Sequence, residues 1–189
     1  MLKWYPQIVK MIVIPGETPP APASFHIDLR EGQIIPGVEG IPGFSSGNRI
    51  VVSSEFMRNQ MHGEALGCLI HEMVHIVQFG SGQRPHHSVP SWFYEGATDY
   101  VRWFQFEPEK NGAAINNPDE VHYNDSYRVT ANFMDWVIRN HAADLLAKAH
   151  GAIHKGYSDE LWEKWTGRSV LQLEAEWKAD MKAHRPSDP

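Results

Sequence analysis

The chain has 189 residues, a length typical of one domain, and its 42% hydrophobic and 21% charged residues match an average globular protein. Its 23 acidic and 17 basic residues give a net charge of −6, which excludes the basic footprint of a nucleic-acid-binding protein. The single cysteine excludes an internal disulfide framework, and no apolar run approaches the roughly 20 residues of a membrane helix. We expect one domain over residues 1–189, a monomer, with no nucleic-acid or membrane partner.

The first half of the chain is predicted to consist of short elements joined by loops. In chain order these are a short amphipathic helix at 4–14, a proline-rich loop at 15–23, a half-buried strand at 24–30, loops with one irregular strand at 31–48, and a strand at 49–53. In the strand at 24–30 apolar and polar residues alternate, which predicts that Ile27 and Leu29 share its buried face. The strand at 49–53 is predicted from its β-branched residues.

The second half is predicted to be helical, because apolar residues recur there at spacings of three, four and seven. The predicted helices cover about 60–79, 91–106, 127–140, 142–154, 158–165 and 169–183, with loops at 80–90 and 107–124. Ser91 is expected to cap the second of these helices, and Ser169 with Gln172 fits a capping box on the last. Strands early and helices late predict an α+β domain.

The helix predicted at about 60–79 carries the run His71–Glu72–Met73–Val74–His75. Residues four apart lie on one face of a helix, so both imidazoles can reach a single tetrahedral ion. Glu72 lies beside them, near enough to act on a metal-bound water. This H-E-x-x-H arrangement is a zinc hydrolase signature with the glutamate as general base. The alternative is a pair of buried histidines that are hydrogen-bonded to their neighbours.

A catalytic zinc site needs a third protein ligand and an open fourth position. Twenty residues after His75, the next predicted helix carries Glu95 and Asp99, again four apart and on one face. If that face meets the first helix, Glu95 can bind the ion and Asp99 can accept a hydrogen bond from the outer N–H of a ligating histidine. Gly96, beside Glu95, would let two helices approach closely. The alternative is an acidic stripe facing solvent, which the bulky aromatic residues around it disfavour.

This pattern resembles a known group of enzymes. H-E-x-x-H followed at this distance by a helix carrying E-x-x-x-D is typical of the gluzincin, thermolysin-like metallopeptidases. More closely, the chain resembles the basic secretory protein peptidase family of plants and bacteria, in the family's order and over nearly the whole chain. The matching stretches are Trp4–Tyr5–Pro6, residues 47–54 (GNRIVVSS), 70–78 (IHEMVHIVQ), 92–102 (WFYEGATDYVR), 127–136 (YRVTANFMDW) and Leu161–Trp162.

The resemblance implies a compact zincin-like domain, with a mixed sheet above the H-E-x-x-H helix. It implies one zinc ion per chain, held by His71, His75 and Glu95. It also implies Glu72 as the catalytic base and Asp99 behind His71. The chain is acidic despite the family name, so no plant-style defence or cell-wall role is carried over.

No signal peptide is visible at the start of the chain, which leaves a cytoplasmic protein or a mature form without its leader. Because the family is mostly secreted, the resemblance implies a secreted or periplasmic location.

A second group is expected to assist the substrate oxyanion. Gluzincins place an electrophilic partner near the start of the third helix, where this chain has Tyr123 and Tyr127. Tyr127 falls on the family's Tyr-x-x-Thr-Ala stretch and is therefore preferred, with Tyr123 as its rival. A purely structural role for Tyr127 is the alternative.

The expected activity is that of a zinc-dependent endopeptidase, in which Glu72 activates a zinc-bound water against the peptide bond. The strand at 49–53, just ahead of the metal helix, is the expected edge along which an extended peptide substrate adds. Two alternatives stay open. One is a zincin-like binding or defence protein with weak or no turnover, and the other is a zinc hydrolase acting on a glycoconjugate or another amide.

Overall fold

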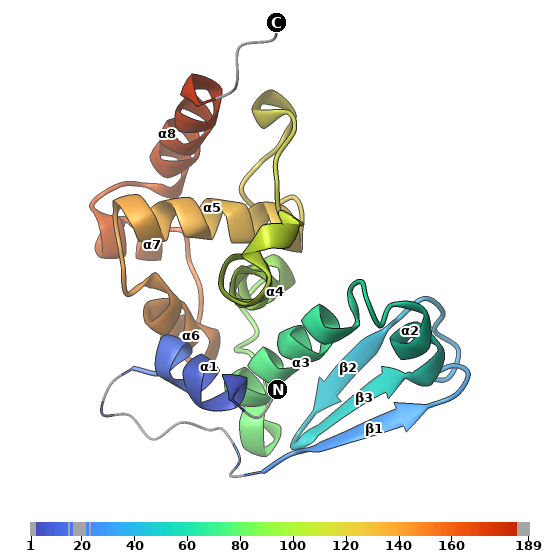
Figure 1. The fold of residues 1–189 in the computed structure, drawn as a ribbon. Helices are drawn as coiled ribbons and strands as arrows, with labels where there is room; N and C mark the ends of the chain where they lie inside the picture. The colour runs from blue at the N-terminus through green and yellow to red at the C-terminus, as the bar shows by residue number, and fades with distance from the viewer. Residues whose placement is uncertain (1–2, 15, 17–21, 23, 185–189) are drawn as a thin grey trace, which may run out of the picture.

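The computed structural model describes residues 3–14, 16, 22 and 24–184, and it has a small sheet beside a larger group of helices (Figure 1). The fold is mixed α/β and mostly helical. The strands are β1 (His26–Arg30), β2 (Gly43–Ser46) and β3 (Arg49–Ser53). The helices are α1 (Trp4–Ile12), α2 (Ser54–Asn59), α3 (Ala65–Phe79), α4 (Ser91–Tyr100), α5 (Tyr127–Asn140), α6 (Leu145–Lys155), α7 (Glu160–Thr166) and α8 (Val170–Ala183). Most of the loop predicted at 15–23 lies outside the described residues.

The sheet is three-stranded and mixed, with β3 in the centre. β1 runs parallel to β3, and β2 runs antiparallel to it. The predicted strands at 24–30 and 49–53 are thus confirmed, and β2 is the irregular strand expected within 31–48. The predicted burial of β1 is wrong, because Ile27 is 40% and Leu29 is 64% exposed. β1 is an outer strand, and its apolar residues are left uncovered.

Helix α3 lies between the sheet on one side and helices α1 and α4 on the other (Figure 1). It contacts β2 and β3 on one side and α1 and α4 on the other. Ile70, Met73, Val74 and Val77 are therefore fully buried, as their helical spacing predicts. The helix predicted at about 60–79 is shorter than expected. A separate helix, α2, precedes it, and the Ser53 hydroxyl caps α2 by accepting a hydrogen bond from the Phe56 N–H at 3.2 Å.

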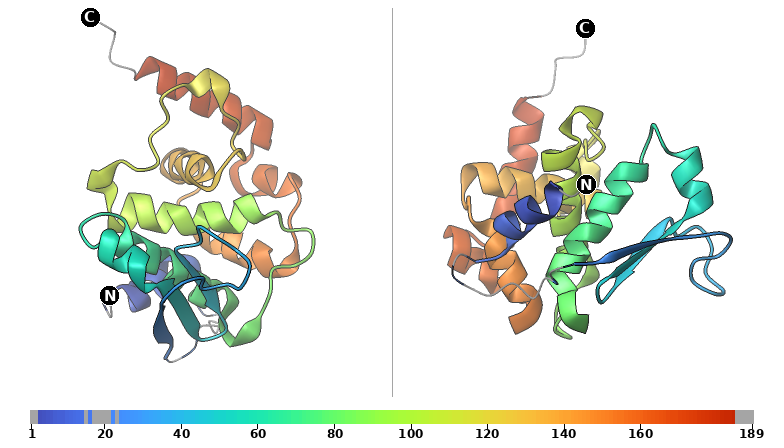
Figure 2. Two further views of the ribbon diagram at one scale, coloured as in Figure 1. Left: turned by 90° about the vertical axis from the view of Figure 1, so that its right-hand side faces the viewer. Right: turned by 60° about the horizontal axis from the view of Figure 1, so that its bottom comes forward.

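Helices α4 and α5 cross steeply, with α5 seen end-on above α4 in the left view of Figure 2. A Cβ atom on Gly96 would lie 2.3 Å from Thr130 Cγ2, so only glycine permits this approach. The close helix contact predicted at Gly96 thus exists, and it joins α4 to α5. The predicted cap of α4 is wrong: Pro90 occupies the capping position, and Ser91 is the first helical residue. After Tyr100 the chain continues as a π-helical stretch, Val101–Phe106.

The last four helices follow the sequence prediction closely. Helix α5 has the predicted bounds, and α8 begins with the predicted capping box of Ser169 and Gln172. Helices α6 and α7 begin three and two residues later than predicted, at Leu145 and Glu160. Helices α7 and α8 pack against α5, where the rings of Trp162 and Trp177 lie 5.2 and 5.4 Å from that of Phe133, and all three residues are fully buried.

Helix α6 carries a second histidine pair, four residues apart like the first, in which His150 is buried and His154 is half-buried. His150 is 5% exposed, its Nδ1 has no hydrogen-bond partner among the described residues, and its ring lies 5.0 Å from that of His154. Burial, and then the charge of His154, lowers the pKa of His150 from 6.5 to about 4.

We expect His150 to make the fold less stable in acid. Between pH 6.5 and about 4 the unfolded chain binds a proton there that the folded chain does not. The free energy of unfolding should therefore fall as pH is lowered through this window, by about 3 kcal/mol at pH 4. Urea unfolding of metal-free protein at pH 7, 5.5 and 4 measures this fall. His150→Leu should reduce it, and the exposed control His62→Gln should not. An unchanged pH dependence in His150→Leu would contradict the prediction.

Candidate metal centre

An open pocket of about 620 Å³ runs along α3, between β2 on one side and α4 with the start of α5 on the other. Gly43 brings β2 close to α3, since a Cβ atom there would lie 3.2 Å from Cys68 Sγ. Polar side chains that line the pocket include Glu64, His71, Glu72, His75, Glu95, Asp99, Arg102, Tyr127 and Arg128. All the site residues predicted from the sequence, except Tyr123, therefore border one cavity.

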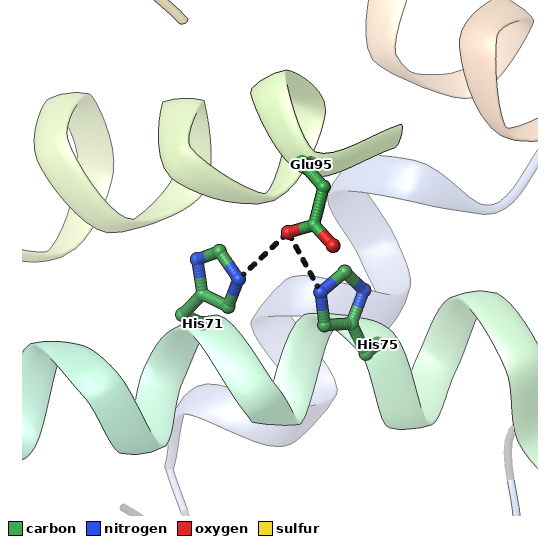
Figure 3. Close-up of side chains that lie close together, drawn as sticks. All are labelled: His71, His75 and Glu95. Carbon is green, nitrogen blue, oxygen red and sulfur yellow. Dashed lines mark hydrogen bonds and ion pairs between the residues drawn. The ribbon is translucent and has the colours of Figure 1, made fainter. Parts of the chain in front are cut away.

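Three of these side chains converge on one point (Figure 3). His71 and His75 project from the same face of α3, and Glu95 reaches down from α4 between them. Glu95 Oε2 lies 3.0 Å from His71 Nε2 and 3.2 Å from His75 Nε2. The three donor atoms all lie within 4.8 Å of one another. The predicted faces of α3 and α4 thus meet each other. Glu95 and Asp99 contact the histidines of α3 and do not form a stripe that faces solvent.

The outer nitrogen of each imidazole is also held. Asp99 Oδ1 lies 2.8 Å from His71 Nδ1, so the carboxylate on α4 supports the ring as predicted. Gln78 Oε1 lies 2.8 Å from His75 Nδ1, a contact that the sequence analysis missed. The contact could have been predicted, because His75 and Gln78 are three residues apart and such residues are neighbours on a helix. With both Nδ1 atoms occupied, the Nε2 atoms are the ones turned toward Glu95.

The electrostatics of this cluster favour a cation. Burial lowers the pKa of His71, but hydrogen bonds to Asp99 and Glu95 outweigh it and raise that pKa to about 10. Burial raises the pKa of Glu95, but hydrogen bonds from His71 and His75 outweigh it and lower that pKa to about 2. Positive charge is thus stabilised between two carboxylates. Two imidazole nitrogens and one carboxylate oxygen at this spacing fit a divalent metal ion.

Glu72 lines the pocket beside this cluster and is only 7% exposed. Within the described chain its carboxylate makes no hydrogen bond and no ion pair. A nearly buried acid without a protein partner is costly unless a ligand or water meets it. Glu72 is therefore placed to act on a molecule bound in the pocket.

The two candidate tyrosines lie in different environments. Tyr127 is 44% exposed and lines the pocket, and burial, followed by the charges of Glu95 and Asp99, raises its pKa. Tyr123 is 8% exposed, packs its ring 5.3 Å from Trp92, and does not line the pocket. The phenol of Tyr127 thus faces the cavity as a protonated donor.

Tyr94 is a second pocket phenol that the sequence analysis did not single out. Its ring lies 6.1 Å from that of His75 and 5.5 Å from that of Phe79. Burial, and then the charge of Glu95, raises its pKa. Because Tyr94 directly precedes the predicted ligand Glu95, its place near the pocket could have been predicted from the sequence.

Ion pairs connect several residues at the border of the pocket. Arg102 is buried and donates to Glu64 at 2.9 Å and to Glu107 at 2.8 Å. Arg128 donates to the same Glu64 oxygen at 3.3 Å. These contacts tie the residue before α3 to the π-helical stretch after α4 and to the start of α5.

The chain belongs to the basic secretory protein family, described as peptidases of plants and bacteria, whose model matches residues 36–177. The family predicted from the sequence is thereby confirmed, and the matched range holds every proposed site residue. The family is one of peptidases, which act on peptides or proteins. Comparison with curated proteins and with solved structures gave no match. In the part of the chain described, no helix is both long and apolar enough to cross a membrane.

Proposed function

We propose that this chain is a zinc-dependent endopeptidase of the gluzincin type, with one zincin-like domain over residues 1–189. The observation that carries the proposal is the convergence of His71, His75 and Glu95 at the wall of a pocket. Beside them lies the carboxylate of Glu72, which has no hydrogen-bond or ion-pair partner among the described residues. Two histidines and a glutamate are a ligand set of catalytic zinc sites. His71, His75 and Glu95 would hold the zinc ion, which would act as a Lewis acid toward the scissile carbonyl and would lower the pKa of the attacking water.

The chain's own residues carry the proton transfers. Glu72 takes the proton of the attacking water and later donates it to the departing amine. Asp99 holds the His71 ring through Nδ1, which keeps Nε2 available as a ligand atom. Tyr127 donates a hydrogen bond to the oxyanion, and its raised pKa keeps the phenol protonated at neutral pH.

The peptide substrate is expected to lie along β2. The strand proposed from the sequence, β3, is central in the sheet and is hydrogen-bonded on both sides, so that expectation is wrong. β2 is an outer strand, and its residues Gly43, Phe44 and Ser45 line the pocket. An extended peptide can pair with such an edge through its main chain.

We also propose a secreted or periplasmic location, which the family's name supports, and a monomer.

We expect Tyr127→Phe to lower kcat by about 10²–10³-fold with KM little changed, as for loss of one oxyanion donor. The substitution removes only a hydroxyl, so zinc content and folding should not change. Steady-state kinetics on a peptide substrate make the measurement. Tyr94→Phe, a matched change in the same pocket, is the control. If kcat falls in Tyr94→Phe and not in Tyr127→Phe, then Tyr94 and not Tyr127 is the oxyanion donor.

A peptide-library digest read by mass spectrometry tests the function itself. We expect internal cleavages that disappear with a chelator and return with zinc. Cleavage that persists in the chelator would contradict the zinc mechanism. Absence of any cleavage by the zinc-loaded protein would favour a binding protein or a hydrolase of glycoconjugates or other amides.

A further inference from the structure

We propose that Gln78 is a positioning residue for the metal ligand His75, fixing both the ring's protonation and its place relative to the second ligand helix. The inference rests on the proposed metal function. Gln78 is 1% exposed and comes one turn after His75 on α3. Its amide meets three groups: His75 Nδ1 at 2.8 Å, the Tyr94 carbonyl at 3.2 Å and the Thr98 hydroxyl at 3.3 Å.

The orientation of the amide follows from the chemistry of its partners. The Tyr94 carbonyl can only accept, so the amide must present its N–H to it. The amide oxygen is thereby turned toward His75 Nδ1. An oxygen without a proton forces Nδ1 to carry one, and in a neutral imidazole the lone pair then resides on Nε2. A main-chain carbonyl on α4 thus determines which nitrogen of His75 is free to bind metal.

The same contacts connect the two helices that carry the metal ligands. Tyr94 directly precedes Glu95, so the Gln78 amide joins the segment of one ligand to the ring of another. Thr98, fully buried on α4, donates to the Tyr94 carbonyl at 2.9 Å and closes this network. Replacing Gln78 should therefore make the orientation of the His75 ring less fixed. It should also make the distance between His75 and Glu95 less fixed.

The support of His75 is neutral, whereas that of His71 is a carboxylate. Asp99, Glu95 and Glu72 already bring three acidic groups to the site. An amide orients the second imidazole without adding a fourth negative charge. This asymmetry explains why a glutamine is suited to this position.

Zinc affinity, measured by competition with a chromophoric chelator, tests the proposal without relying on turnover. Gln78→Met keeps the length and removes both polar atoms, and we expect zinc to bind about 10–100-fold more weakly. Gln78→Glu keeps an acceptor for His75 but loses the N–H that meets the Tyr94 carbonyl, so we expect its affinity to lie between those of wild type and Gln78→Met. Gln105→Met, the same change at a glutamine outside the pocket, should bind zinc like wild type.

Two further measurements separate positioning from a merely structural role. Thermal unfolding of the metal-free variants reports stability, and the visible spectrum of the cobalt-substituted protein reports ligand geometry. We expect Gln78→Met to alter the cobalt spectrum and Gln78→Glu to restore it toward wild type. Wild-type affinity in Gln78→Met, or affinities that fall only in step with metal-free stability, would overturn the proposal. If the wild type itself bound no zinc, the metal centre would be refuted, and this inference with it.

Discussion

Glu72→Gln should lower kcat by about 10²–10⁴-fold, the range that general acid–base catalysis contributes, while the protein keeps its zinc and its fold. The amide has nearly the size of the carboxylate but cannot take a proton. Glu72 has no protein partner in the described chain, so the substitution breaks no hydrogen bond or ion pair. Loss of activity with full zinc content is therefore the expected signature.

Kinetics and elemental analysis on the same preparation make this measurement. Glu109→Gln, an exposed glutamate outside the pocket, is the matched control and should leave both values unchanged. Near-normal turnover in Glu72→Gln would show that another group activates the water. Loss of zinc in this variant would instead assign Glu72 to the ligand set.

His75→Ala should remove the metal. We expect about one zinc per wild-type chain and almost none in this variant, because a histidine and a carboxylate alone leave the ion with too few protein ligands. Activity should fall to background in parallel. The expected loss is larger than for Asp99→Asn, which acts through the His71 ring and should cost about 10–100-fold in affinity or activity.

The second histidine pair provides the control for this experiment. His150 and His154 have the same spacing and nearly the same ring separation as His71 and His75, 5.0 Å against 4.9 Å. Among the described residues, however, only the first pair has a carboxylate that completes a three-donor group. His150→Leu should therefore retain the zinc. Full zinc retention in both His71→Ala and His75→Ala would refute the proposed site.

The comparison of the two pairs also shows where sequence reasoning is strong. Helix geometry relates residues three and four apart without reference to the rest of the fold. The shared face of His71 and His75, that of Glu95 and Asp99, the bounds of α5 and the capping box of α8 were all predicted on this basis. The contact of Gln78 with His75 follows the same rule and could have been predicted.

The tertiary structure decided what depends on long-range packing. Strand order made β3 central and β2 the edge at the pocket, although β3 precedes the metal helix more closely in sequence. The outer position of β1 left Ile27 and Leu29 uncovered despite their alternation. Tyr123 and Tyr127 lie four residues apart, yet Tyr123 is packed against Trp92 whereas Tyr127 lines the cavity.

Local spacing therefore determined which side chains share a face of a helix in this protein. The meeting of those faces, and the side chains that border the cavity between them, depend on pairings between residues far apart in the chain. One example is the contact of Gly96 with Thr130, which brings α5 onto α4. Such pairings follow from the packing of the whole core, which no local pattern specifies.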